Sequence, residues 1–376
     1  MAASPLAQLL QSSRDHWTLS PLMLLVMISS CAVKPAPIEM PLKLEVPVAE
    51  VISDLQRYIP IKMRESGVPG LSIALIRDGK LVWAQGFGVT NVLIGEPVTE
   101  TTIFEAASIG KPITAYAALK LRDAGAVALD QPLQSYLRRP YLRPSQWASQ
   151  ITLRQVLSHT SGLSNSVFGN TRIHFQPGSQ FSYSGVGFEY LQKVIEQVTE
   201  MEFDNYMQQA VFKPLAMASS SYEYKPEFES RAACRHFNLG VAIPEPWFWE
   251  PTPDAKNLVR STPSDIARFM IELIQPQHIS SATIDEMTSE QVRVTEHVRW
   301  GLGIGLQPSS QGEAFWQWGD DPGFESLMVG YRAQRIGVVI MTNSSKGQQI
   351  LREIAARAIG GSHYSYWDDV NMILVF

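Results

Sequence analysis

The segment FEAASIGKPITA, residues 104–115, carries a serine, Ser108, three positions before a lysine, Lys111, at the beginning of a predicted helix over 108–124. Pro112 supports this placement, because proline is tolerated in the first turn of a helix, where backbone amides have no carbonyl partner. Side chains three apart share one face of a helix, so the Lys111 amine would lie within reach of the Ser108 hydroxyl. The positive end of the helix dipole also stabilises negative charge at this point. The segment therefore predicts a hydroxyl and an amine held side by side at a helix N-terminus.

A serine hydroxyl is a weak nucleophile at neutral pH unless a neighbouring group accepts its proton. A lysine amine can accept that proton if burial or nearby positive charge lowers its pKa. Ser108 and Lys111 are therefore sufficient for nucleophilic chemistry. Their spacing alone is weak evidence, because a serine at a helix N-terminus is a common capping residue.

The chain before this segment predicts one helix and one β-hairpin. Apolar residues recur at helical spacing over 48–67, and the Gly-Val-Pro-Gly run at 67–70 ends the pattern. Two strand-like runs follow, 71–76 and 81–86, and the Asp-Gly pair at 78–79 between them is typical of a tight hairpin turn. An antiparallel pair of strands therefore precedes the serine.

The middle of the chain, about 130 to 290, has mainly helical patterns, and strand patterns return after it. The fold class predicted is α/β (α+β): an antiparallel sheet built from both ends of the chain, flanked by the terminal helices, with an inserted helical lobe. A site would lie where the lobe meets the sheet. The predicted helices are 152–157, 187–198, 203–211, 264–273 and 348–359, and the predicted strands are 301–305, rich in glycine, 326–331 and 336–342.

Composition and charge favour a folded enzyme and exclude several other classes. Apolar residues make up 45% and charged residues 18% of the 376 residues, which is a globular balance. The formal net charge of −5, with no basic run interleaved with aromatics, predicts no nucleic-acid partner. The sequence has no His-Glu-x-x-His motif and no close Cys or His cluster, so neither a metal nor another cofactor is expected. It also lacks a Gly-x-Ser-x-Gly motif, which argues against an ordinary α/β-hydrolase.

The amino terminus resembles an export signal. Residues 22–28 form an apolar run too short to span a bilayer, which takes roughly 20 residues, but suited to a signal peptide. Ser29-Ser30-Cys31 resembles a bacterial lipobox, so we expect residues 1–31 to act as a lipoprotein-type signal peptide, Cys31 to carry lipid, and residues 32–47 to form a Pro-rich linker. That interpretation predicts an exported protein of the cell envelope or periplasm, anchored to a membrane. A plain secretory signal and an uncleaved cytoplasmic extension are the alternatives.

Three segments resemble, in order and spacing, the motifs of the serine β-lactamase, DD-peptidase and related esterase family. They are FEAASIGKPITA at 104–115, LSHTSGL at 157–163 and the stretch 177–191, which contains FSYSG. The resemblance implies that Ser108 is the acylated nucleophile, and that Lys111 and Tyr183 share the transfer of its proton. It leaves open which of the two is the principal base.

The chain departs from the family pattern at two positions. Gly185 stands where the family usually has an asparagine that binds the lysine and the substrate amide. Gln317-Trp318-Gly319 matches a motif whose first residue is usually lysine or histidine, and a neutral amide offers a carboxylate only dipolar hydrogen bonds. We assign Gly185 and these three residues to substrate binding. By resemblance, the backbone amides of Ser108 and Asp320 would form the oxyanion hole.

Two further features admit a functional and a structural interpretation. His159 could activate a serine, but it occurs in the family's structural segment, so we predict that it satisfies backbone groups. The aromatic run Trp247-Phe248-Trp249, set between prolines, could line an acyl or aryl pocket or pack on the lobe.

The resemblance extends over about 50 to 360, so we expect a β-lactamase-like serine hydrolase domain over 48–366 and a C-terminal tail over 367–376. It implies an acyl-serine intermediate and an ester, lactone, amide or peptide substrate. The two departures favour esterase-like activity over a proficient β-lactamase. The alternative is a penicillin-binding-type envelope binding or sensor protein with slow or lost turnover. A purely structural lipoprotein would leave Ser108, Lys111 and Tyr183 unexplained.

Overall fold

The structure, a computed structural model, describes residues 38–164, 171–237, 240–243, 254–256 and 259–363. The chain divides into two units, Met1–Pro35 and Ala36–Phe376, and every described residue belongs to the second. The predicted signal peptide with Cys31, the aromatic run Trp247-Phe248-Trp249 and the predicted tail lie outside the described residues.

An eight-stranded antiparallel sheet forms the centre of this unit, with the order β3-β2-β13-β12-β11-β10-β9-β8. The predicted hairpin is present, and its first strand pairs with a strand from the far end of the chain, with Ile73 opposite Ile340. The prediction that both ends build one antiparallel sheet is therefore confirmed. The strands are β2 (Gly70–Arg77), β3 (Lys80–Gly88), β8 (Val292–Arg293), β9 (Arg299–Trp300), β10 (Gly305–Ser309), β11 (Gly312–Asp321), β12 (Phe324–Tyr331) and β13 (Ile336–Thr342).

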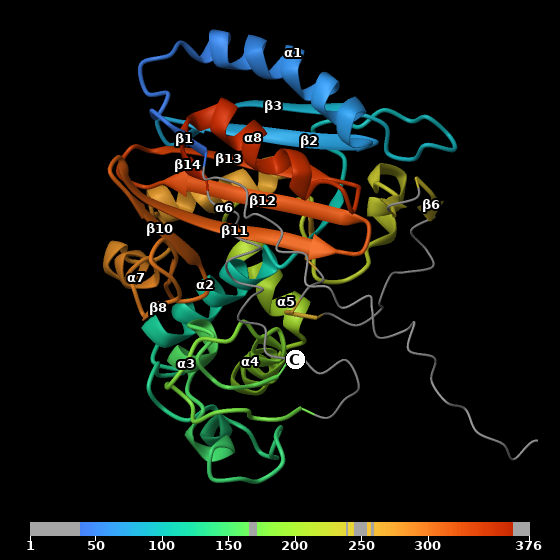
Figure 1. Ribbon diagram of the computed structural model, residues 1–376. Helices are drawn as coiled ribbons and strands as arrows, with labels where there is room; N and C mark the ends of the chain where they lie inside the picture. Colours follow the sequence, from blue (N-terminus) through green and yellow to red (C-terminus); the bar gives the residue numbers. More distant parts are fainter. Residues whose placement is uncertain (1–37, 165–170, 238–239, 244–253, 257–258, 364–376) are drawn as a thin grey trace, which may run out of the picture. The chain divides into compact units, whose positions relative to one another are not determined.

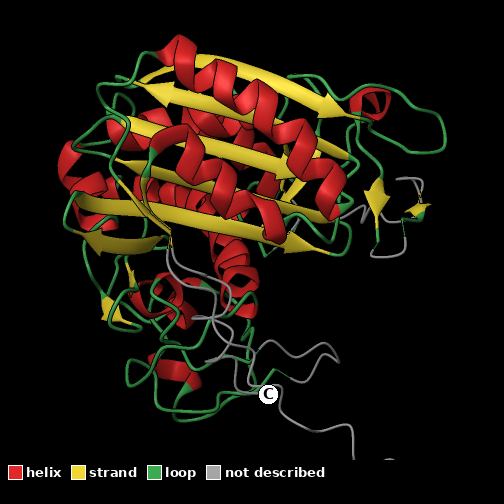
Figure 2. Cartoon of the chain, turned by 45° about the horizontal axis from the view of Figure 1, so that its top comes forward, coloured by secondary structure: helices red, strands yellow, loops and turns green. Residues whose placement is uncertain are grey.

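Helices cover both faces of the sheet because side chains alternate along its buried strands. On β2, Ile73 belongs to the apolar core shared with α1 (Val48–Ser66) and α8 (Gln348–Ile359), whereas Ala74 belongs to the core shared with α6 (Pro263–Ile274). Figures 1 and 2 show α1 and α8 lying along the same face. The helix predicted at 264–273 was assigned to the central helical region, and the structure places it against β2, β3 and β13 instead.

Most of the remaining helices gather beyond the β11 side of the sheet (Figure 1). The central one is α2. Every residue from Gly110 to Leu119 is buried, so this part of the helix packs against other elements on all sides. The helix predicted over 203–211 divides, because α5 passes into a π-helical turn at Gln208. The helical elements are α2 (Gly110–Asp123), η3 (Leu133–Tyr136), η4 (Ala148–Gln150), α3 (Leu153–Leu157), α4 (Val186–Thr199), α5 (Phe203–Met207), η5 (Gln208–Phe212), η6 (Pro226–Arg231) and α7 (Ser281–Met287).

The glycine-rich run predicted as a strand over 301–305 is a bend, and only Gly305 enters β10. Gly303 adopts a positive φ of 81°, and a Cβ there would lie 2.4 Å from the Cβ of Ala115 on α2. Its amide donates to the Leu157 carbonyl at 2.9 Å. Glycine is therefore required here because the chain turns and lies close to α2, and the prediction of a strand was wrong for residues 301–304.

Three short strand pairs complete the unit. β4 (Phe104–Ala107) pairs with β7 (Val259–Ser261), and β5 (Arg235–His236) pairs with β6 (Ala242–Ile243). β1 (Ile38–Met40) pairs with β14 (Gly361–His363), so part of the stretch predicted as a linker contributes a strand. Within the part of the chain that the structure describes, no helix is both long and apolar enough to cross a bilayer.

Candidate active site

Ser108 lies in a turn between β4 and α2, and its side chain is buried. The residue before it, Ala107, has a positive φ of 50°, a strained conformation for a side chain with a Cβ. The helix begins at Gly110, two residues later than predicted. The Lys111 amide nevertheless donates to the Ser108 carbonyl at 3.1 Å, so the serine is joined to the first turn of the helix.

Lys111 is buried and directs its amine at Ser108. Its Nζ donates to Ser108 Oγ at 2.9 Å and to the Lys256 carbonyl at 2.6 Å. Burial lowers the pKa of Lys111 to about 7; Asp254 and Glu189 oppose this shift, while the positive charge of Lys256 adds to it. Near neutral pH a large fraction of Lys111 is therefore an uncharged amine, able to accept the serine proton across the same contact.

Tyr183 is the second group at the serine. Its hydroxyl is hydrogen-bonded to the Ser108 side chain and accepts from Gln317 Nε2 at 3.1 Å. Burial raises the pKa of Tyr183 above its ordinary value, so the phenol keeps its proton at neutral pH. The Lys111 Nζ lies 5.0 Å from the centre of the tyrosine ring. The structure thus brings together the three residues that the sequence predicted as catalytic.

The strand β11 supplies Gln317, Trp318 and Gly319 beside the serine. Gln317 is fully buried and donates from Nε2 both to Tyr183 and to the Trp318 carbonyl at 3.0 Å, so its nearest partners are protein atoms. The Trp318 ring lies 5.1 Å from that of Tyr183 and stacks on Trp316. The sequence analysis assigned Gln317 to substrate binding and missed its contact with the tyrosine.

At Gly319, β11 lies close to β4. A Cβ at this residue would lie 2.1 Å from the Ala106 carbonyl oxygen and 2.3 Å from Ser326 Oγ, so no larger residue fits. Asp320 follows Gly319, and β10 pairs with β11 only as far as Trp316. The part of β11 that carries Asp320 is therefore not paired with β10.

Gly185, two residues after Tyr183, is the N-cap residue of α4, and its carbonyl accepts from the Glu189 amide at 3.1 Å. Glycine brings no side-chain amide to this position. The Lys256 carbonyl takes the second hydrogen bond of Lys111 instead. Sequence reasoning missed this contact, because a backbone acceptor 145 residues away has no residue-type signal.

His159 supports the segment that carries Tyr183. Its Nδ1 accepts from the Ser184 amide at 3.0 Å, its carbonyl accepts from the Ser182 amide at 2.8 Å, and its ring centre lies 4.2 Å from that of Tyr183. Burial and the nearby Lys111 lower the pKa of His159 well below its ordinary value, so the ring is neutral. These contacts agree with the structural role predicted for it.

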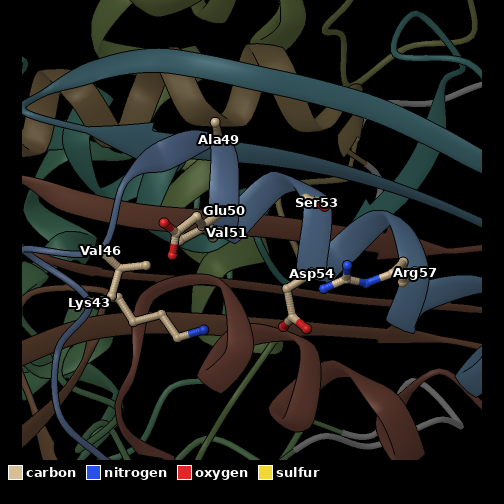
Figure 3. A pocket seen from close by; sticks show the side chains of 8 residues that line it. All are labelled: Lys43, Val46, Ala49, Glu50, Val51, Ser53, Asp54 and Arg57. Carbon is tan, nitrogen blue, oxygen red and sulfur yellow. The ribbon is translucent and has the colours of Figure 1, made fainter.

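A surface groove along α1 is separate from this site. The open groove in Figure 3 is lined by α1 and the chain before it, with Lys43, Glu50 and Asp54 among its side chains, and contains none of the predicted catalytic residues. Among His, Cys, Asp and Glu side chains that the structure describes, no group of three is arranged to hold a metal ion.

Comparison with known proteins identifies the family. Residues 55–360 match the Beta-lactamase family. The chain is 22% identical over 355 residues to Protein flp of Staphylococcus aureus (strain N315), covering 85% of this chain and 71% of the relative. The octameric penicillin-binding protein homologue from Pyrococcus abyssi superposes with a TM-score of 0.68 at 26% identity, over 78% of this chain and 74% of that chain. The D-alanine carboxypeptidase AmpC from Burkholderia cenocepacia has the same fold, with a TM-score of 0.73 at 20% identity over 83% and 99% of the two chains. Since the family match spans most of the sequence, the chain belongs to the beta-lactamase family of serine hydrolases.

Proposed function

We propose that the chain hydrolyses an ester, lactone, amide or peptide through an acyl intermediate on Ser108, and that esters are better substrates than β-lactams. The observation that carries the proposal is the 2.9 Å contact between the buried Lys111 Nζ and Ser108 Oγ. A lysine with a pKa of about 7 is matched to general-base catalysis at neutral pH.

In the first half of the reaction, Lys111 accepts the Ser108 proton while Oγ forms a bond to the substrate carbonyl carbon. The backbone amides of Ser108 and Asp320 would donate to the negative oxygen that develops. The proton then passes through the Tyr183 hydroxyl to the leaving group as its bond to carbon breaks. In the second half, water gives a proton to the same groups while its oxygen bonds to the acyl carbon. The bond between that carbon and Ser108 Oγ then breaks, the carboxylic acid leaves, and Oγ takes the proton back.

The preference for esters rests on two residues. Gln317 is neutral, so this residue offers no positive charge to a substrate carboxylate. Its Nε2 already donates to Tyr183 and to the Trp318 carbonyl. Gly185 offers no side chain to a substrate amide. Both features support an uncharged acyl group and a leaving group that needs little recognition.

The test combines a reactive fluorophosphonate and a short-chain p-nitrophenyl ester, applied to the purified protein and to Ser108→Ala. We expect an adduct on the peptide that contains Ser108, found by intact mass and peptide mapping, and ester turnover that the variant lacks. A folded protein that labels elsewhere, or whose turnover survives Ser108→Ala, would contradict the proposal.

A second candidate is a penicillin-binding-type binding or sensor protein in the envelope. The substitutions at Gly185 and Gln317 favour it, because both alter groups that the resembled family uses to hold substrate. Stoichiometric labelling of Ser108 without turnover is the outcome that would select it.

We also propose that the protein is exported and held at a membrane through lipid on Cys31, as the lipobox-like Ser29-Ser30-Cys31 supports. Labelling of cells with a fatty-acid analogue tests this. Incorporation that disappears in Cys31→Ala is expected, and equal incorporation in both proteins would contradict the anchor.

A further inference from the structure

The carbonyl that binds Lys111 belongs to Lys256, and α4 contacts Lys256 and its neighbour Ala255. Gln192 Oε1 accepts from the Ala255 amide at 3.0 Å, and Glu189 Oε1 accepts from Lys256 Nζ at 2.8 Å. Glu189 and Gln192 are three residues apart on the helix and therefore project from neighbouring positions. The Lys256 carbonyl thus accepts a hydrogen bond from Lys111, and the Lys256 side chain donates to Glu189 on α4.

The ion pair is partly shielded from solvent. The Lys256 and Glu189 side chains are 36% and 31% exposed, and the Tyr141 hydroxyl donates to Glu189 Oε2 at 3.5 Å. Lys256 also donates its backbone amide to Asp254 Oδ1 at 2.7 Å. Side chain, amide and carbonyl of one residue are thus all engaged, which fixes the direction in which the carbonyl points.

We propose that Glu189 and Lys256 are positioning residues whose ion pair holds the Lys256 carbonyl against Lys111 and so directs the Lys111 amine at Ser108. The inference rests on the proposed hydrolase function. The Lys256 carbonyl accepts the second hydrogen bond of the catalytic lysine. Gly185, at the position where the resembled family usually has an asparagine, has no side chain to accept it. Since α4 follows directly after Tyr183, one helix then orients both groups that handle the serine proton.

The charges around Lys111 give the two partners opposite electrostatic effects. Glu189 and Asp254 favour the charged amine, whereas Lys256 disfavours it. His159 and Tyr183, which also face Lys111, are uncharged at neutral pH. Removal of Glu189 therefore lowers the pKa of Lys111, and removal of Lys256 raises it, although both changes break the same ion pair.

The experiment compares Glu189→Gln, Lys256→Met and the charge-reversed double variant Glu189→Lys/Lys256→Glu in the full chain. Each single variant should lower kcat/KM for p-nitrophenyl ester hydrolysis by about ten- to a hundredfold, because the lysine loses its orientation. The rise of kcat/KM with pH should move to lower pH in Glu189→Gln and to higher pH in Lys256→Met. The double variant should recover to within about threefold of the wild type, because the reversed ion pair forms again.

Lys193→Met is the matched control, because Lys193 is exposed and forms an ion pair with Glu196 on the same helix, 2.7 Å between Nζ and Oε2. We expect its kcat/KM and pH profile to equal those of the wild type. Losses that simply add in the double variant, or pH profiles that shift in the same direction in both single variants, would overturn the positioning role.

A second readout separates failure of this inference from failure of the proposed function. The Lys111 amine can be titrated by NMR in protein labelled with carbon-13 at lysine Cε, and Lys111→Arg assigns the signal. If the wild type shows neither labelling nor turnover, the proposed function fails, and this titration still decides on the ion pair. Shifts of the Lys111 pKa in opposite directions support it, and an unchanged pKa in both variants contradicts it.

Discussion

Gln317 Nε2 donates to the Tyr183 hydroxyl at 3.1 Å, and this contact determines what the tyrosine can do. A phenol has one proton to donate and can accept at its oxygen. The Tyr183 oxygen accepts from Gln317, and the hydroxyl is also hydrogen-bonded to Ser108, so these two contacts together fix the orientation of the phenol. A residue at a position expected to bind substrate thus orients the tyrosine that is predicted to transfer the proton.

Replacement of Gln317 by leucine should therefore lower kcat and leave KM nearly unchanged. We expect a loss of about ten- to a hundredfold in kcat for ester hydrolysis, because the phenol is no longer held in one orientation. The measurement is steady-state kinetics at neutral pH. In a Tyr183→Phe background the same substitution should have little further effect, and an equal loss in both backgrounds would show that Gln317 acts on the substrate directly.

Ester hydrolysis should depend on pH through Lys111. The amine must be uncharged to accept the serine proton, and burial sets its pKa to about 7. Activity should therefore fall as the pH drops below about 7 and reach a plateau above it. The check is kcat/KM between about pH 5.5 and 8.5, with Lys111→Arg expected to be inactive throughout. A flat wild-type profile over this interval would exclude Lys111 as the base.

Local patterns predicted most of the fold and the core of the site. α8 has the predicted bounds, and the α1 pattern ends at Gly67, whose φ of 68° suits a helix terminus. Ser108 and Lys111 are close because the turn of Ser108 leads directly into the first turn of α2, which is a local relationship. The place of Tyr183 followed from the family resemblance and not from periodicity.

The missed features depend on contacts between distant segments. The bend at 301–304 arises because Gly303 lies against Ala115, and no local pattern distinguishes that requirement from a glycine-rich strand. The Lys256 carbonyl reaches Lys111 through the backbone, for which every residue type is equivalent. The Gln317–Tyr183 contact joins residues 134 positions apart and becomes apparent only when the sheet and the helical region are assembled.

Replacement of Lys111 by methionine should abolish activity and stabilise the fold. The pKa of Lys111 falls from an ordinary value of 10.5 in the unfolded chain to about 7 in the folded protein. The folded state therefore binds the proton of this amine more weakly, which lowers the free energy of unfolding at neutral pH. Methionine removes this penalty, and we expect the free energy of unfolding at pH 7 to rise by about 1–3 kcal/mol. Urea denaturation followed by tryptophan fluorescence measures it.

The gain in stability should itself depend on pH. Below pH 7 both folded and unfolded wild type carry the proton, so the full penalty applies, and it declines as the pH rises toward 10.5. The advantage of Lys111→Met should shrink over the same interval. Lys193→Met, at an exposed position on α4, should change stability little at any pH, and a Lys111→Met protein less stable than the wild type would contradict the account.

Gly319→Ala should damage both stability and catalysis. The new Cβ would lie 2.1 Å from the Ala106 carbonyl oxygen, a backbone atom two residues before Ser108, so β11 and β4 must separate. We expect a loss of about 2–4 kcal/mol in the free energy of unfolding, and a fall in kcat because the Asp320 amide, proposed for the oxyanion hole, is displaced with β11. Gly187→Ala is the control. Its nearest neighbour would be a side-chain atom of Val156 at 3.3 Å, and Gly187 lies in α4, where alanine is favoured over glycine. Equal stability of the two variants would show that β11 does not lie as close to β4 as Gly319 indicates.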